Sequence, residues 1–393
     1  MKYDFDKIID RRGTGSLKWN VKEGELPMWV ADMDFETAPA VKEAILEKAR
    51  QGVFGYSETD GEWADAYAQW WESRHGTVLD KEKLIFATGV VPIISSAVRK
   101  LTTVGENVLV QTPTYNIFFN SIVNNGRNVV ENRLVYDGEA YSMDFCDLER
   151  KLSDPQTTLM ILCNPQNPCG NIWDRDTLAK VGELCRKHGV TVISDEIHCD
   201  LTAPGKGYVP FASVSDTCRD ISVSCLAPTK AFNIAGIQTA AAYVPNKFLH
   251  HRLWRALNTD EVAEPNIFAV TAAVSAFRFG GEWLDELREY LFENRRTAED
   301  YISCNVCGIR PVRSYATYLM WLDCAELLGE GRTSSELARF IRSETGLYLS
   351  DGGVYRGDGG KFLRMNLACP KSVLNDGLER LKNGAAAFAD KVN

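Results

Sequence analysis

The sequence predicts an α/β fold that consists of a mostly parallel, seven-stranded sheet and a smaller α+β unit. Short apolar segments rich in β-branched residues recur between residues 84 and 244, and helix-length segments separate several of them. Strands that are apolar on both faces are typical of a parallel sheet covered by helices. The alternation indicates α/β architecture, and the mixture of helices and strands after residue 246 predicts the second unit.

The first 38 residues are polar and interrupted by glycines, apart from one apolar group at 26–30. We expect this segment to wrap around the rest of the chain. Apolar residues at helical spacing predict helices over 39–51 and 60–75. The tryptophans of the second helix are expected in the core or at a subunit contact; they are Trp63, Trp70 and Trp71.

The elements of the main sheet follow in order along the chain. The predicted strands are 84–87, 107–111, 128–131, 158–163, 190–194, 221–225 and 239–244, and the helices between them are 91–101, 115–124 and 175–188. Beyond them we expect helix 283–303, strand 318–323, helix 334–345, strand 362–367 and helix 372–387. The predicted domains are therefore an N-terminal segment, 1–45, that joins the small domain, a large domain, 46–280, and a small α+β domain, 281–393.

The charge and the cysteine content exclude several classes of protein. There are 44 Lys and Arg against 53 Asp and Glu, a net charge of −9, which disfavours nucleic acid or anionic membranes as partners. No signal peptide and no run of about 18 apolar residues is apparent, so a cytoplasmic protein is expected. The 11 scattered cysteines indicate reduced thiols. Cys304 and Cys307 have the spacing of half a zinc site, but no second half follows, so no metal is expected.

Four motifs follow predicted strands, where α/β proteins bind ligands. Gly89 opens a helix whose free N–H groups could hold a phosphate, Asn167 lies in a pair of Asn-Pro turns, Asp195 follows strand 190–194, and Lys230 follows strand 221–225. Each has an ordinary explanation as a turn, a helix cap or a solvated lysine. Together they supply a phosphate seat, an amide, a carboxylate and an amine, which is what pyridoxal phosphate requires.

The order of these motifs resembles that of fold-type I pyridoxal-phosphate enzymes, which have the aspartate aminotransferase fold. The resemblance is closest to cystathionine β-lyase and the cystalysin-like carbon–sulfur lyases, the MalY/PatB-type group of the class I/II aminotransferase superfamily. It covers nearly the whole chain, through segments 10–19, 29–35, 54–56 and 364–368.

The resemblance implies a role for each site residue. Lys230 would form the Schiff base with the pyridoxal 5'-phosphate aldehyde and act as the catalytic base, Asp195 would pair with the pyridine nitrogen, and Tyr115 would stack on the ring as a further catalytic residue. Asn167 would bind the ring hydroxyl. The remaining cofactor-binding residues would surround the phosphate or the ring: Gly89, Val90, Val91, His198, Thr229 and Tyr56.

The resemblance also implies how substrate and subunits bind. Arg364 would clamp the substrate α-carboxylate with its planar fork. Tyr56 would reach the cofactor phosphate of a neighbouring subunit and contribute to substrate binding, which implies a homodimer with shared active sites. Asp32 lies near the expected substrate mouth and is a further candidate for substrate binding. Asp32 and Asp34 could also be paired acids, but two acids in a loop at this place are more often solvated or capping.

Three residues depart from the usual aminotransferase pattern: His198 replaces a tyrosine, Gln238 an arginine and Ala227 a serine. These departures resemble the lyase group. The implied reaction is α,β-elimination on L-cystathionine, with L-cysteine or other S-substituted cysteines as further candidates, to give a thiol (homocysteine or sulfide), pyruvate and ammonia. The alternatives are an aminotransferase and a regulatory protein that retains the fold. Size selection is expected from 29–33 and 315–318, and the glycine-rich segment 351–360 is expected to be only a tight turn.

Overall fold

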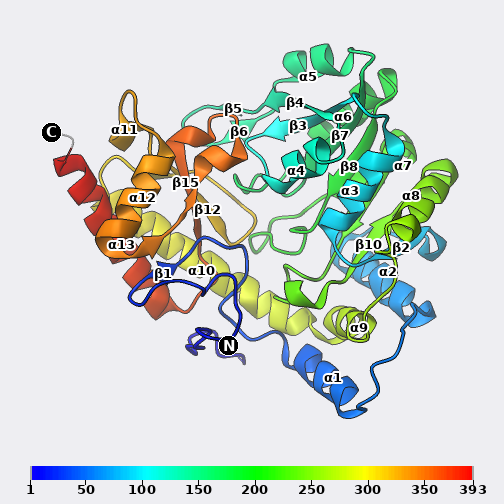
Figure 1. Cartoon of the computed structure of the whole chain (residues 1–393), viewed down its shortest axis with the longest axis horizontal. Coiled ribbons are helices and arrows are strands. Elements are labelled where there is room, and N and C mark those ends of the chain that lie inside the picture. Colours follow the sequence, from blue (N-terminus) through cyan, green and yellow to red (C-terminus); the bar gives the residue numbers. More distant parts are fainter. Residues whose placement is uncertain (1, 392–393) are drawn as a thin grey trace.

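The computed structural model describes residues 2–391, and its centre is a seven-stranded sheet (Figure 1). The strands are β2 (Leu84–Ala87), β3 (Asn107–Thr112), β4 (Asn128–Arg133), β7 (Thr157–Cys163), β8 (Thr191–Asp195), β9 (Ser222–Leu226) and β10 (Ala240–Tyr243). Their order is β2-β10-β9-β8-β7-β3-β4. Only β10 runs antiparallel to its neighbours, so the prediction of a mostly parallel sheet is confirmed.

Both faces of this sheet are apolar because helices cover both. Val108 and Val110 of β3 pack in the core formed with α3 (Val90–Leu101), α4 (Ile117–Val123) and α8 (Lys247–Thr259), whereas Leu109 between them packs on the opposite side. The other helices around the sheet are α2 (Gly61–His75), α5 (Phe145–Leu152), α6 (Arg175–Lys187), α7 (Asp216–Ile221) and α9 (Ala269–Phe279). Alternate side chains of a strand point to opposite faces, so every position must be apolar.

The three tryptophans of α2 lie in the core. Trp63, Trp70 and Trp71 are 3%, 4% and 0% exposed, so their expected place in the core is favoured over a subunit contact. Trp70 also donates from its indole Nε1 to the Asp200 carboxylate at 3.0 Å. The helix begins at Asp60, whose side chain accepts from the Trp63 backbone N–H, and ends at Gly76 in the left-handed conformation that glycine adopts most easily.

A smaller antiparallel sheet forms the second region of the molecule. Its order is β11-β12-β15-β14, and the strands are β11 (Arg310–Pro311), β12 (Leu319–Asp323), β14 (Ser350–Asp351) and β15 (Phe362–Asn366). Helices α12 (Ser334–Thr345) and α13 (Lys371–Asp390) lie beside it, with α11 (Ala325–Leu328) near its edge. The long helix α10 (Gly281–Asn305) extends from the large sheet to the small one (Figure 1). The domain boundaries at residues 45 and 280 remain predictions.

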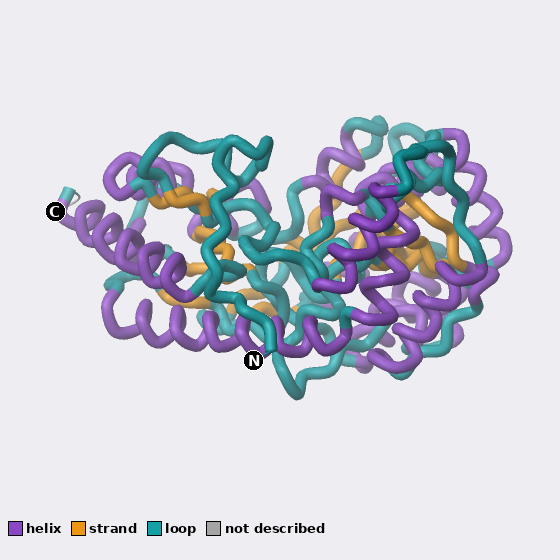
Figure 2. Tube along the Cα trace, turned by 90° about the horizontal axis from the view of Figure 1, so that it is seen from below, coloured by secondary structure: helices purple, strands orange, loops and turns teal. Residues whose placement is uncertain are grey.

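The N-terminal segment runs along the smaller region and then reaches α1, as the blue trace in Figure 1 shows, and the chain next to its N-terminal end is loop in Figure 2. Strand β1 (Leu26–Pro27) pairs with β13 (Leu347–Tyr348) of the smaller region, and α1 (Pro39–Arg50) packs on α9. The remaining short strands, β5 (Val135–Tyr136) and β6 (Tyr141–Ser142), form a hairpin. Within residues 2–391, no helix combines the length and apolar character needed to cross a membrane.

A buried ion cluster fixes the N-terminal segment. Lys18, 1% exposed, donates to Asp34 Oδ2 at 2.7 Å, and Asp34 Oδ1 accepts from Arg11 Nη1 at 2.9 Å and from Trp19 Nε1 at 2.7 Å. Arg11 Nη2 also donates to Asp32 Oδ2 at 2.8 Å. The expectation that Asp32 and Asp34 are solvated or capping is therefore wrong. Their partners lie in a loop without periodicity, which a sequence pattern does not reveal.

We expect Asp34→Asn to destabilise the protein strongly, because the Lys18 ammonium would stay buried without its main counter-charge. Removing one partner of a buried pair costs about 3 kcal/mol of the free energy of unfolding. Chemical denaturation of the two proteins measures the difference. Asp65→Asn, which removes an exposed ion pair with Lys81, is the control and should leave the midpoint nearly unchanged. Equal midpoints for wild type and Asp34→Asn would contradict the role of the cluster.

Candidate active site

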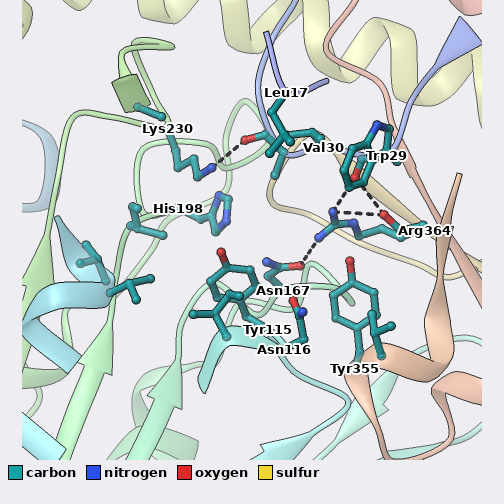
Figure 3. Close-up of a pocket in the computed structure, with 18 of the residues that line it drawn as sticks. Leu17, Trp29, Val30, Tyr115, Asn116, Asn167, His198, Lys230, Tyr355 and Arg364 are labelled. Carbon is teal, nitrogen blue, oxygen red and sulfur yellow. Dashed lines mark hydrogen bonds between the residues drawn. The ribbon is translucent and has the colours of Figure 1, made fainter. Parts of the chain in front are cut away.

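A cavity of about 730 Å³ lies where the ends of β2, β7, β8 and β9 face the smaller region. It brings together most of the residues predicted from the sequence: Gly89, Val90, Val91, Tyr115, Asn167, Asp195, His198, Thr229, Lys230 and Arg364. Figure 3 shows Lys230 and Arg364 pointing into the cavity from opposite sides, with Asn167 between them. The N-terminal segment lines one side of it through Leu17, Trp29 and Val30.

Lys230 follows β9, in the turn that carries the chain toward β10. Its Nζ donates to the Ala31 backbone carbonyl at 2.6 Å. Burial and the nearby Arg364 charge together lower the pKa of this amine to about 8, while Asp32 and Asp195 act in the opposite direction. A lysine with a lowered pKa supplies a neutral amine near physiological pH, which makes it a nucleophile and a base.

Asp195 ends β8 and is 4% exposed. Its Oδ1 accepts from the Ile197 backbone N–H at 3.1 Å. Burial raises the pKa of its carboxyl to about 7, although the Ile197 backbone N–H and the Lys230 charge act in the opposite direction. A ligand with a cationic N–H at this position would stabilise the carboxylate.

His198 is also buried, at 3% exposed, and its Nδ1 has no hydrogen-bond partner among residues 2–391. Burial and the charges of Lys230 and Arg364 lower the pKa of its imidazole to about 3. The ring is therefore neutral at physiological pH. An unpartnered buried nitrogen costs free energy, so a ligand that bonds to this ring would gain that interaction.

Arg364 lies on β15 and is 5% exposed. Its Nη1 donates to Asn167 Oδ1 at 3.1 Å and its Nη2 to the Trp29 carbonyl at 2.8 Å. The Nε–H is buried and has no acceptor in the described part of the chain. Two hydrogen bonds thus hold the guanidinium in place, and its Nε–H can donate to a carboxylate ligand.

The start of α3 provides a binding site for an anion. The first helical N–H groups, those of Val90 and Val91, precede the first internal hydrogen bond, which Ile93 makes to Gly89. A Cβ at Gly89 would lie 3.3 Å from Pro92 Cδ, closer than most such contacts. Thr229 and Gln238 line the cavity as well. Backbone N–H groups at a helix start favour a phosphate.

These groups together fit pyridoxal phosphate. The cofactor would bring a ring nitrogen for Asp195, a ring oxygen for Asn167 or His198, an aldehyde for Lys230 and a phosphate for the start of α3. The unpartnered Nδ1 of His198 and the incompletely compensated Asp195 carboxyl are the observations that support this fit. Tyr115 lines the same cavity, and burial raises the pKa of its phenol.

Two predicted residues do not line the cavity. The Tyr56 side chain is fully exposed, at 103%, so this single chain does not test its expected role toward a neighbouring subunit. Asp32 is bound by Arg11, and Lys18 Nζ lies 3.7 Å from its Oδ1. Its carboxylate therefore already has counter-charges, and we do not retain it as a direct substrate ligand.

Of the two segments expected to select substrate size, only the first lines the cavity. Trp29, Val30 and Ala31 line the cavity, but residues 315–318 do not. Tyr318 instead donates its hydroxyl to the Ala31 carbonyl at 2.9 Å, behind the cavity wall. The glycine-rich segment makes two 3₁₀ turns before β15, as expected, yet it also contributes Val354 and Tyr355 to the cavity.

The sequence did not reveal the part of the cavity that α12 supplies. Ser335, Ala338, Arg339 and Arg342 line it, together with Tyr348 just after the helix. The amphipathic pattern predicts the helix, and a capping box formed by Thr333 and Glu336 marks its start. No local signal shows which of its exposed positions faces the cavity, because that depends on how the two regions pack.

Comparison with known proteins finds similarity to enzymes of the aminotransferase fold along nearly the whole chain. The family model for aminotransferase class I and II matches residues 26–381. The chain is 43% identical over 386 residues to cystathionine beta-lyase PatB of Bacillus subtilis, covering 96% of this chain and 99% of that protein. Cystalysin from Treponema denticola, which contains a pyridoxal 5'-phosphate cofactor, has a TM-score of 0.94 at 30% identity, covering 99% and 100% of the two chains. The PLP-bound C-S lyase from Staphylococcus hominis has a TM-score of 0.92 at 29% identity, covering 98% and 99%.

Proposed function

The chain belongs to the class I and II aminotransferase family, and from this premise we propose that it is a pyridoxal-phosphate-dependent carbon–sulfur β-lyase. Its reaction is the α,β-elimination of L-cystathionine and related S-substituted cysteines, in which cystathionine and water give homocysteine, pyruvate and ammonia. The observation that carries this choice of reaction is the 43% identity to a cystathionine beta-lyase along nearly the full length of both chains.

Different residues of the cavity have different roles in the proposed reaction. Bound pyridoxal phosphate supplies an electron sink that stabilises negative charge at the substrate Cα. Arg364 binds the α-carboxylate through its fork and so fixes which bond at Cα faces Lys230. The Lys230 amine takes the proton from Cα, the Cβ–S bond breaks, and the protonated Lys230 can return a proton to the departing sulfur.

The remaining predicted residues hold the cofactor. We assign Asp195 to its ring nitrogen, Asn167 and His198 to its ring oxygen, and Tyr115 to the ring face. The phosphate is assigned to the start of α3 and the Thr229 hydroxyl. The lowered pKa of Lys230, the raised pKa of Asp195 and the position of Arg364 across the cavity support these assignments.

We further propose a cytoplasmic homodimer in which Tyr56 reaches the cavity of the partner chain. Val53 and Phe54, which precede Tyr56, are 74% and 62% exposed. Neighbouring exposed apolar side chains are typical of a surface that a second chain covers. Sedimentation equilibrium of the purified protein tests the number of subunits.

The function is tested by incubating the purified holoenzyme with L-cystathionine or L-cysteine in the absence of any 2-oxo acid. Prompt release of pyruvate and thiol supports elimination. A shift to the spectrum of the pyridoxamine form without pyruvate would instead support an aminotransferase. If a Lys230→Ala variant retained the cellular role, the regulatory alternative would be favoured.

The pKa of Lys230 predicts how covalent attachment of the cofactor depends on pH. Only the neutral amine attacks an aldehyde, and burial lowers the pKa to about 8. The rate of attachment to the apoprotein should therefore rise about tenfold per pH unit below 8 and level off above it. Borohydride trapping at timed intervals, followed by peptide mass analysis, measures the rate at Lys230.

Unfolded apoprotein is the control for this experiment. Without burial, the amine should have the ordinary lysine pKa of about 10.4, so its rate should continue to rise beyond pH 9. The same continued rise in the folded apoprotein would contradict the lowered pKa.

A further inference from the structure

The cavity extends past Arg364 as far as α12, where Ser335, Ala338 and Arg339 line it. Its volume of about 730 Å³ falls in the range of about 300–1,000 Å³ that is typical of small-molecule sites. The reacting groups lie at the Lys230 end. The α12 end is therefore available to the part of a substrate that lies beyond the sulfur atom.

A continuous wall connects the two ends. Arg364 Nη2 donates to the Trp29 carbonyl at 2.8 Å, and the Trp29 indole stacks on the Tyr348 ring with centroids 4.8 Å apart and an interplanar angle of 16°. The Arg342 guanidinium lies 3.7 Å from the centroid of the Tyr348 ring. This aromatic pair leads from the proposed α-carboxylate clamp to the surface of α12.

The two arginines of α12 differ in how their charges are used. Arg342 makes two hydrogen bonds of 2.8 Å to the Glu25 carboxylate, from Nε and from Nη2. Arg339 lies three residues earlier, on the same side of the helix. Its Nε donates to the Ser335 carbonyl at 3.2 Å, and it forms no ion pair with any residue that the structure describes. Arg339 is exposed and lines the cavity, so its guanidinium is available to an anionic group of a ligand there.

A carboxylate lines the same end of the cavity. Asp351 ends β14, and its Oδ1 accepts from Ser334 Oγ at 2.5 Å and from the Gly353 backbone N–H at 2.9 Å. Its Oδ2 makes no hydrogen bond within residues 2–391 and is not sealed from solvent. The α12 end therefore carries one cation and one anion that are not paired with each other. Opposite charges in one pocket complement a zwitterion.

We propose that Arg339 binds the distal carboxylate of the substrate, with Asp351 facing its distal ammonium group. The site would then select S-substituted cysteines whose sulfur arm ends in an amino-acid group over those with a plain alkyl arm. This proposal rests on the proposed function, because it concerns the second half of the same substrate. It makes Arg339 a specificity-determining residue.

The first test compares L-cystathionine with S-propyl-L-cysteine. The propyl group has the same three-carbon chain beyond the sulfur atom, but it lacks the distal ammonium and the distal carboxylate. The ratio of their kcat/KM values should fall about tenfold in Arg339→Gln, mainly through a higher KM for cystathionine. Arg310→Gln removes an exposed arginine on β11 that pairs with Glu326, and it should leave the ratio unchanged.

A charge reversal makes the test independent of any loss of folded protein. In Arg339→Glu, kcat/KM for S-(2-aminoethyl)-L-cysteine relative to S-propyl-L-cysteine should rise several-fold, and the value for S-(2-carboxyethyl)-L-cysteine should fall. Partial unfolding lowers all rates by the same factor, so it does not produce opposite shifts. Unchanged ratios in both variants, with an active wild type, would overturn the subsite alone. A wild type that releases no pyruvate from any of these compounds would overturn the proposed function and the subsite with it.

Discussion

Lys230→Ala is expected to lower kcat for pyruvate release from cystathionine by at least about 10³-fold, because it removes the base and the proton donor together. The variant should also lose the covalent link to the cofactor. Borohydride treatment of cofactor-saturated protein should therefore label residue 230 in the wild type and no residue of that peptide in the variant. Steady-state pyruvate assays and peptide mass analysis give the two readouts.

Lys247→Ala serves as the control for this experiment, because Lys247 is an exposed lysine at the start of α8. It should retain wild-type activity and labelling. If wild-type protein saturated with cofactor shows no label at Lys230, the assignment of the nucleophile is wrong. If Lys230→Ala keeps its activity, the assignment of the base is wrong.

Asp195→Asn is expected to lower kcat by about 10²–10³-fold, the effect typical of losing one charge-stabilising group in a closed site. The amide keeps the shape of the side chain but no longer holds a proton on a ring nitrogen. The electron sink would therefore be weaker, whereas Arg364 would still bind the α-carboxylate. We expect KM to change much less than kcat, which steady-state kinetics on cystathionine would show.

The neighbouring residue provides a matched control for Asp195. Glu196 is fully buried, but its Oε1 accepts from Ser194, Ser224 and the Phe211 backbone, away from the cavity. Glu196→Gln should lower stability while the folded holoenzyme keeps kcat within a few-fold. Equal losses of kcat in the two variants would show that Asp195 acts through the packing of the strand end rather than through its charge.

The positions of Lys230 and Asp195 could be predicted because each lies at or just beyond the carboxyl end of a strand of the parallel sheet. The carboxyl ends of such strands meet at one edge, so short-range patterns already place these side chains together. The same reasoning found Gly89 and Asn167. The strands themselves were recognisable because both of their faces are buried, which leaves little choice of residue type.

The other parts of the site depend on contacts between distant segments. Arg339 and Tyr348 reach the cavity only because α12 packs beside β14 and β15 of the smaller region, which forms the other side of the cavity. β1 and β13 have two residues each, too few for an alternating pattern, so their pairing was not predicted. The pairing of Asp34 with Lys18 joins two loop residues 16 positions apart. The role of Tyr56 toward a second chain stays a prediction, because one sequence does not position another chain.

The Ala31 carbonyl accepts hydrogen bonds from both Lys230 and Tyr318. This acceptor is a main-chain atom, so every amino acid placed at position 31 would still provide it. Alanine scanning would pass over it, and a tally of residue types among related proteins would assign no importance to the position. An amide-to-ester replacement of the bond between residues 31 and 32, introduced by chemical ligation, would weaken this acceptor and measure what the backbone itself contributes to orienting the amine.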